Sequence, residues 1–229
     1  MFRRTTALWA TAFLSIAVTA EKSFAFRSGP PAAHNGSTAS GGATCRVCHG
    51  SASGGGMVQI LGAPAEYEAD ALYNLTVRVT DAAKAGAGFQ LSVETAAGAQ
   101  AGTILVSDAD NTQLNPNAGV VWINHTLAGV DDAVANWVAM GNSAEYHLEW
   151  LAPAGDVGPV TFWAAGNAIN DDDFNTGDVI YLHNQSATFT EDVPVPAVST
   201  WSLIAMGLIL ITAGTVVIGR GAVAPKRIH

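Results

Sequence analysis

A regular alternation of apolar and polar residues near the middle of the chain limits its fold more than any other feature. In Leu72–Thr80 the apolar set is Tyr73, Leu75, Val77 and Val79, and the polar set is Asn74, Thr76 and Arg78. A period of two places these sets on opposite faces of a β-strand. Gly88–Glu94 alternates in the same way. Both stretches therefore predict strands with one face in the core.

Shorter stretches of strand composition follow at regular intervals, separated by Gly, Asn, Asp and Pro. They are Thr103–Val106, Val120–Asn124, Ala144–Trp150, Pro159–Ala165, Asp178–His183 and Ala187–Thr190. The only helix suggested in this part is a short one over Asp131–Met140. Residues 26–200 are enough for one hydrophobic core. We therefore predict an all-β protein whose strands form an antiparallel β-sandwich.

Both cysteines of the chain lie in one short motif, because residues 45–49 read C-R-V-C-H. C-x-x-C-H is the attachment signature of a c-type haem. The pattern predicts that Cys45 and Cys48 bind haem c covalently and that His49 binds the iron as the proximal axial ligand. The glycines around the motif predict a flexible arm. We assign residues 26–62 to this haem-attachment segment.

Three other uses of paired cysteines fit the sequence less well. A thioredoxin-like dithiol lies beside a βαβ unit, whereas this motif lies between Gly41-Gly42 and Gly54-Gly55-Gly56. A structural zinc site needs about four ligands, often from a second C-x-x-C, and the sequence has no second cluster. A disulfide across this short spacing is strained.

The first residues have the order of an export signal. Arg3 and Arg4 form a basic start, Ala7–Ala20 is apolar but too short to span a bilayer, and Ser23-Phe24-Ala25 fits a cleavage site of small residues. We assign residues 1–25 to a signal peptide. Export agrees with the haem prediction, because haem is attached to C-x-x-C-H outside the cytoplasm.

The other end of the chain predicts a membrane segment. Residues 193–200 form a Pro-containing hinge, and residues 201–219 form an uncharged apolar run just long enough for a transmembrane helix. The cations of the basic tail, residues 220–229, predict a cytoplasmic C-terminus and a domain outside the cytoplasm.

Pro196–Trp201, followed by an apolar run and then Arg220, resembles the bacterial C-terminal sorting signals of the PEP-CTERM type. It is most similar to the IPTL-type variant, with alanine and valine in place of threonine and leucine. The resemblance implies a partner, a membrane protease (exosortase) that cuts near the motif. The protein would then be anchored at the cell envelope, or lie at the cell surface after processing.

Several segments between the ends occur in an order that is typical of one family. They are Tyr67, Tyr73–Val79, Gly88–Leu91, His125-Thr126, Trp150–Pro153, Gly158–Asn167 and Gly177–Tyr181. They resemble the bacterial Reeler-like family called choice-of-anchor V, although Ala69-Asp70 replaces the family's Pro-Gly. Its members carry an N-terminal C-x-x-C-H and a C-terminal sorting signal. The resemblance implies an immunoglobulin-like sandwich over residues 63–192 and no established activity.

A haem that carries electrons takes a second axial ligand, commonly Met or His. We expect His147 to point outward from its strand and His183 to be solvated at a strand end. His125 is the first candidate, because it matches a histidine of the Reeler-like motif and ends a rigid strand. His34 is the second candidate and Met57 the third. The remaining alternative is a five-coordinate iron with an open sixth position.

Charge limits the partners of the exported part. Only four of the ten Lys and Arg lie in residues 26–200, against 18 of the 19 Asp and Glu, which leaves this segment at about −14. That balance argues against binding nucleic acid and suits a cationic redox partner or calcium. Asn170–Asp178 is acidic, but counted from Asp171 its Gly is seventh and position twelve is Leu182, whereas an EF-hand loop has Gly sixth and Glu twelfth.

Three functional hypotheses follow. The first is an exported, envelope-anchored monohaem cytochrome-like protein, an electron carrier rather than an enzyme, with an unidentified redox partner. The second is a non-enzymatic surface or adhesion module with calcium on its acidic loops. The third is a haem enzyme such as a peroxidase, which requires an open position on the iron.

Overall fold

The computed structural model describes residues 26–50, 52–191 and 204. The first of two compact units ends at Thr190. The predicted signal peptide 1–25, hinge 193–200 and tail 220–229 lie outside the described residues, as does the predicted membrane helix 201–219 except for Ile204. No helix within the described ranges is both long and apolar enough to cross a membrane.

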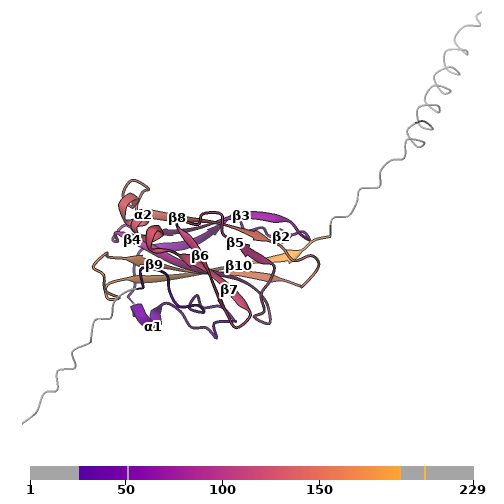
Figure 1. The fold of residues 1–229 in the computed structure, drawn as a ribbon, viewed down its shortest axis with the longest axis horizontal. Helices are drawn as coiled ribbons and strands as arrows, with labels where there is room; N and C mark the ends of the chain where they lie inside the picture. The colour runs from indigo at the N-terminus through magenta and orange to yellow at the C-terminus, as the bar shows by residue number, and fades with distance from the viewer. Residues whose placement is uncertain (1–25, 51, 192–203, 205–229) are drawn as a thin grey trace, which may run out of the picture. The chain divides into compact units, whose positions relative to one another are not determined.

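Two β-sheets pack against each other in a β-sandwich (Figure 1). The four-stranded sheet has the order β1 (Met57–Leu61), β3 (Leu72–Thr80), β8 (Ser143–Leu151) and β5 (Thr103–Leu105). The six-stranded sheet has the order β2 (Glu66–Tyr67), β10 (Val179–Phe189), β9 (Val160–Ile169), β4 (Gly86–Thr95), β7 (Val120–His125) and β6 (Thr112–Asn117). Two helices, α1 (Arg46–His49) and α2 (Leu127–Asn136), complete the described elements.

The alternation in the sequence produces the core as predicted. Leu75, Val77 and Val79 of β3 are buried, while the polar residues between them lie on the other face. The same holds for β8, where Trp150 contributes a fully buried ring. This ring meets Phe162 of the opposite sheet edge-on, with ring centroids 4.9 Å apart. Burial of these apolar faces is the main stabilising contribution to the sandwich.

Several elements differ from the predictions. The stretches Asp178–His183 and Ala187–Thr190 belong to one continuous strand, β10. The helix α2 begins at Leu127, before the predicted Asp131, because Thr126 Oγ1 caps it by accepting the Gly129 N–H at 3.0 Å. The strands β1, β2 and β6 were not predicted. The pairing is antiparallel except between β10 and the two-residue edge strand β2, which are parallel.

Strand β4 is buried on both faces, which its alternation does not predict. Phe89, Leu91 and Val93 point into the core, and the polar side chains of the other face are also fully buried. These polar residues are Gln90, Ser92 and Glu94, which we call the β4 polar row. The residues that cover this row come from the N-terminal segment.

The prediction of a flexible arm is therefore wrong for residues 26–50. Gln90 accepts the His34 N–H through Oε1 at 2.7 Å and donates to the Pro31 carbonyl at 2.9 Å. Glu94 Oε2 accepts the Ala39 N–H at 2.9 Å. Peptide groups of the arm thus satisfy side chains that would otherwise be buried without partners. We call residues 26–50 the docked arm.

Asn35 is a buried polar contact of the docked arm, with 1% of its surface exposed. Its Nδ2 donates to Ser92 Oγ at 2.8 Å and to the Trp163 carbonyl at 3.0 Å. Its Oδ1 accepts the Trp122 Nε1–H at 3.2 Å. One amide therefore bonds the arm to three strands of the six-stranded sheet.

We expect Asn35→Ala to lower the free energy of unfolding by about 2–4 kcal/mol, because it leaves several buried polar groups without partners. Urea unfolding measures this loss, and limited proteolysis should show earlier cleavage within the docked arm. Asn117→Ala, at an exposed position of β6, is the matched control and should change stability by less than about 0.5 kcal/mol. Equal stability of the two variants would contradict the docking that we describe.

Candidate functional site

The C-x-x-C-H motif forms a single helical turn on the surface of the six-stranded sheet. Cys45 is the N-cap of α1 and His49 is its last residue, and Gly50 ends the turn with a positive φ of 72°. Arg46 donates to the Ile180 carbonyl of β10 at 3.2 Å. Asn175 donates to the Cys48 carbonyl at 2.6 Å. These contacts hold the motif against the loop between β9 and β10.

His49 is fixed by a buried carboxylate. Its Nδ1 lies 2.7 Å from Oδ2 of Asp178, of which only 1% is exposed. A carboxylate oxygen is a hydrogen-bond acceptor, so this contact favours the tautomer with the proton on Nδ1. In that tautomer Nε2, which lies 3.5 Å from Asn167 Nδ2, is the nitrogen that could ligate a metal. This is the arrangement in which histidines commonly bind metals.

Asp178 itself is held on both oxygens. Its Oδ1 accepts the Asn170 N–H at 3.2 Å, and its Oδ2 lies 3.3 Å from Asn167 Nδ2. The Oδ1 atom of Asn167 is buried and has no hydrogen-bond partner among the described residues. A carboxylate held in this way keeps its orientation toward His49.

Both cysteines are free thiols. Cys45 Sγ donates to the His34 carbonyl at 3.3 Å. Burial of this thiol, the largest effect, raises the pKa of Cys45 to about 12. A redox dithiol needs the opposite shift, toward the thiolate. The environment of Cys45 therefore disfavours thioredoxin-like chemistry.

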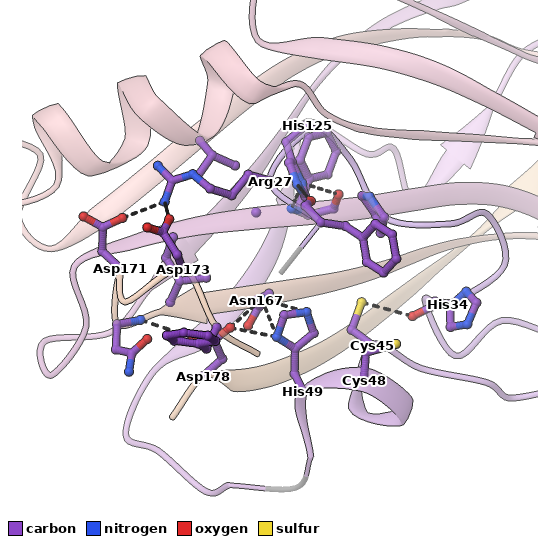
Figure 2. A pocket seen from close by; sticks show the side chains of 18 of the residues that line it. Arg27, His34, Cys45, Cys48, His49, His125, Asn167, Asp171, Asp173 and Asp178 are labelled. Atoms are coloured by element: carbon purple, nitrogen blue, oxygen red, sulfur yellow. Dashed lines mark hydrogen bonds and ion pairs between the residues drawn. The ribbon is translucent and has the colours of Figure 1, made fainter. Parts of the chain in front are cut away.

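The motif lines one wall of a mainly apolar cleft (Figure 2). Its apolar lining includes Phe26, Pro30, Pro31, Phe89, Val130 and Ile169, and its polar lining includes Cys45, Cys48, His49, His34 and His125. The cavity volume of this cleft is about 60 Å³, which is below the range of about 300–1,000 Å³ that is typical of cofactor clefts.

His125 lies at the end of β7 in the same cleft, and Figure 2 shows it across the gap from His49. It is 7% exposed. The Phe89 N–H donates to its Nδ1 at 2.9 Å, while the Phe26 carbonyl lies 3.4 Å from its Nε2. Burial lowers the pKa of His125 to about 4, so its imidazole is neutral at pH 7. Gly88 is needed beside it, because a Cβ there would lie 2.5 Å from the ring.

The remaining sequence candidates occupy different places. His34 also lines the cleft, and its Nδ1 lies 2.8 Å from the Ala32 carbonyl. Met57 is half exposed at the start of β1 and does not line the cleft. His147 points outward, as predicted, and pairs with Thr76. His183 is exposed, as predicted, but it lies within β10 and not at a strand end.

The acidic loop after β9 forms one lip of the cleft, and Arg27 neutralises part of it. The Arg27 guanidinium lies 2.8 Å from Asp171, 3.4 Å from Asp173 and 2.8 Å from Asp131 of α2. Asp171 and then Asp131 raise the pKa of Arg27. No group of three or more His, Cys, Asp or Glu in the described part of the chain is arranged to hold a metal ion.

Sequence reasoning missed Asp178, Asn167 and Arg27 as site residues. The first two were quoted only as markers of a family resemblance, and Asp178 also as part of an acidic loop. No spacing in the sequence links Asp178 to His49. A signal was nevertheless available, because Asp178 is the first residue of the predicted strand Asp178–His183 and so lies next to a loop, where functional side chains are common.

We expect His125 to make stability depend on pH. Because its folded-state pKa is lowered from 6.5 to about 4, the unfolded chain binds more protons between these values. Its contribution is complete above about pH 6.5 and is lost as the pH falls to about 4, by up to about 3 kcal/mol. Urea unfolding of the haem-free chain across this range measures the slope.

The matched variants are His125→Asn and His147→Asn. Asparagine at position 125 offers Oδ1 to the Phe89 N–H in place of Nδ1 but does not titrate. We expect the first variant to flatten the pH dependence and the second, at an exposed position, to leave it unchanged. A slope that survives His125→Asn would show that other groups cause it.

Solved structures similar to this chain include reeler domains. The Reelin-N domain of F-spondin is 18% identical, with 64% of this chain and 95% of that domain covered and a TM-score of 0.43. The reeler domain of human F-spondin is 16% identical, with coverages of 63% and 98% and a TM-score of 0.43. AvmM, which catalyses macrocyclization in alchivemycin A biosynthesis, is 14% identical, with coverages of 62% and 92% and a TM-score of 0.33. No protein-family model and no curated protein matches the chain.

Proposed function

We propose that this protein is an exported, envelope-anchored monohaem c-type cytochrome-like protein that transfers electrons. Cys45 and Cys48 would bind the haem covalently, and His49 would be the proximal ligand. One observation carries the proposal. The Nδ1 atom of His49 lies 2.7 Å from the buried Asp178 carboxylate, so that Nε2, which lies 3.5 Å from Asn167 Nδ2, is the nitrogen that would ligate the iron.

The residues of the cleft fit the group that the motif implies. A porphyrin is a flat, largely apolar ring, and the walls beside the motif are formed by Phe26, Pro30, Pro31 and Phe89. When bound, haem supplies one-electron redox chemistry. The chain contributes the thiols that hold it, the histidine that ligates it and the apolar walls that reduce its contact with water.

His125 remains the first candidate for the distal ligand, and the geometry supports it. Its imidazole is neutral and lies in the same cleft as His49. To ligate through Nε2, His125 must carry its proton on Nδ1, and the Phe89 carbonyl lies 3.2 Å from Nδ1 to accept it. The cost is the Phe89 N–H bond, which would lose its acceptor. His34 is the second candidate.

The proposal includes location and partners. The segment 1–25 supports export, and the apolar segment 201–219 supports anchoring with the domain outside the cytoplasm. The sorting-signal resemblance adds an exosortase-like protease as a partner. The charge of about −14 in residues 26–200 suits a cationic redox protein and disfavours nucleic acid.

An absorption spectrum tests the proposal directly. The full chain is exported in a bacterial host with c-type haem maturation, and a pyridine haemochrome is recorded. We expect a c-type spectrum with one haem per chain, retained under denaturing conditions, and its loss in Cys45→Ser/Cys48→Ser. If a control cytochrome matures in the same cells and this chain carries no covalent haem, the proposal is wrong.

The distal ligand is tested by the spin state of the same protein. We expect sharp low-spin bands in the unchanged protein and high-spin bands in His125→Gln, because the second axial imidazole is lost. His147→Gln is the control, since His147 points away from the cleft. Circular dichroism confirms that each variant is folded. Low-spin bands that persist in His125→Gln would exclude His125 as the ligand.

A further inference from the structure

We infer that Asp178 is a positioning residue that fixes the proximal histidine and lowers the reduction potential of the haem site. The inference rests on the proposed function for its redox part and on the geometry alone for its positioning part. Its basis is the hydrogen bond between a side chain of the docked arm, His49, and a side chain of the sandwich, Asp178.

The placement of Asp178 makes it effective. It directly precedes β10, and only 1% of its surface is exposed. The Asn170 N–H occupies its Oδ1 at 3.2 Å, and Asn167 Nδ2 lies 3.3 Å from its Oδ2. With both oxygens engaged, the carboxylate cannot turn away from His49 without breaking buried hydrogen bonds. The sandwich therefore sets the orientation of a ring that belongs to the arm.

The charge of Asp178 is concentrated on this one imidazole. Among the salt bridges of the described residues, Asp178 pairs with His49, whereas Asp171 and Asp173 pair with Arg27. Burial weakens the screening by solvent, so the interaction is stronger than it would be at the surface. A carboxylate on Nδ1–H makes the imidazole a more basic ligand. A more basic axial ligand favours the oxidised iron and lowers the potential.

Two substitutions separate charge from position. Asp178→Asn keeps an oxygen acceptor for Nδ1–H but removes the negative charge. Asp178→Ala removes both. The matched control is Asp81→Asn, because Asp81 is also buried beside β10 but bonds to Tyr181 at 2.6 Å and does not touch His49.

The redox readout is the midpoint potential of the haem-loaded full chain, measured with mediators. We expect Asp178→Asn to raise the potential by the equivalent of about a tenfold change in the reduction equilibrium, which is about 59 mV for one electron, with one haem still attached per chain. Asp81→Asn should leave it unchanged. If Asp178→Asn does not shift the potential, or shifts it no more than Asp81→Asn does, the redox part is wrong.

The positioning readout uses the chain without haem. Nitrogen-15 NMR of the histidine rings reports which nitrogen carries the proton. We expect His49 to hold its proton on Nδ1 in the unchanged chain and in Asp178→Asn, and to populate both tautomers in Asp178→Ala. A mixture of tautomers in the unchanged chain would overturn the positioning role. Because this result needs no haem, it is independent of whether the chain proves to be a cytochrome.

Discussion

The β4 polar row is the constraint on which the rest of the structure depends. Gln90, Ser92 and Glu94 are fully buried, and buried polar groups without partners cost about 1–3 kcal/mol each. The row satisfies itself only in part, through the bond that Ser92 Oγ donates to Glu94 Oε1 at 2.6 Å. The docked arm supplies the partners through its peptide groups and through Asn35. Arm and sandwich are therefore one structural unit, and the position of the C-x-x-C-H turn follows from this docking.

The candidate site is assembled across that same boundary. The arm contributes Cys45, Cys48 and His49, and the sandwich contributes His125 and Asp178. Neither part contains the site by itself, although the covalent attachment that we propose needs only the motif. Docking thus adds what attachment lacks, namely a defined orientation of the proximal histidine and a second imidazole in the same cleft. The Reeler-like resemblance concerns the β-sandwich fold, and the sorting-signal resemblance concerns the location of the protein. The residues of the candidate site lie at the boundary between the docked arm and the sandwich.

The sequence predicted the features that depend on local periodicity and missed those that depend on distant contacts. The alternation of Leu72–Thr80 predicted both the strand β3 and its buried face. The same rule predicted an exposed polar face for Gly88–Glu94, because alternation does not reveal what covers a strand. Polar residues in the middle of β10, at 184–186, suggested a turn but remain in the strand, where they are paired with β9. The link between His49 and Asp178 joins residues 129 positions apart, which no spacing motif records.

The electrostatics of the cleft bear on the proposed haem site. A buried carboxylate is costly unless a positive charge or several hydrogen-bond donors compensate it. Among the described residues, Asp178 has no Lys or Arg in salt-bridge distance and pairs only with His49, whose ring is cationic only when protonated. The backbone and amide donors of Asn170 and Asn167 supply partial compensation. A ferric centre bound to His49 Nε2 would place positive charge on the far side of the same ring. In that arrangement the charge of Asp178 stabilises the oxidised site through His49 and needs no protonation of the histidine.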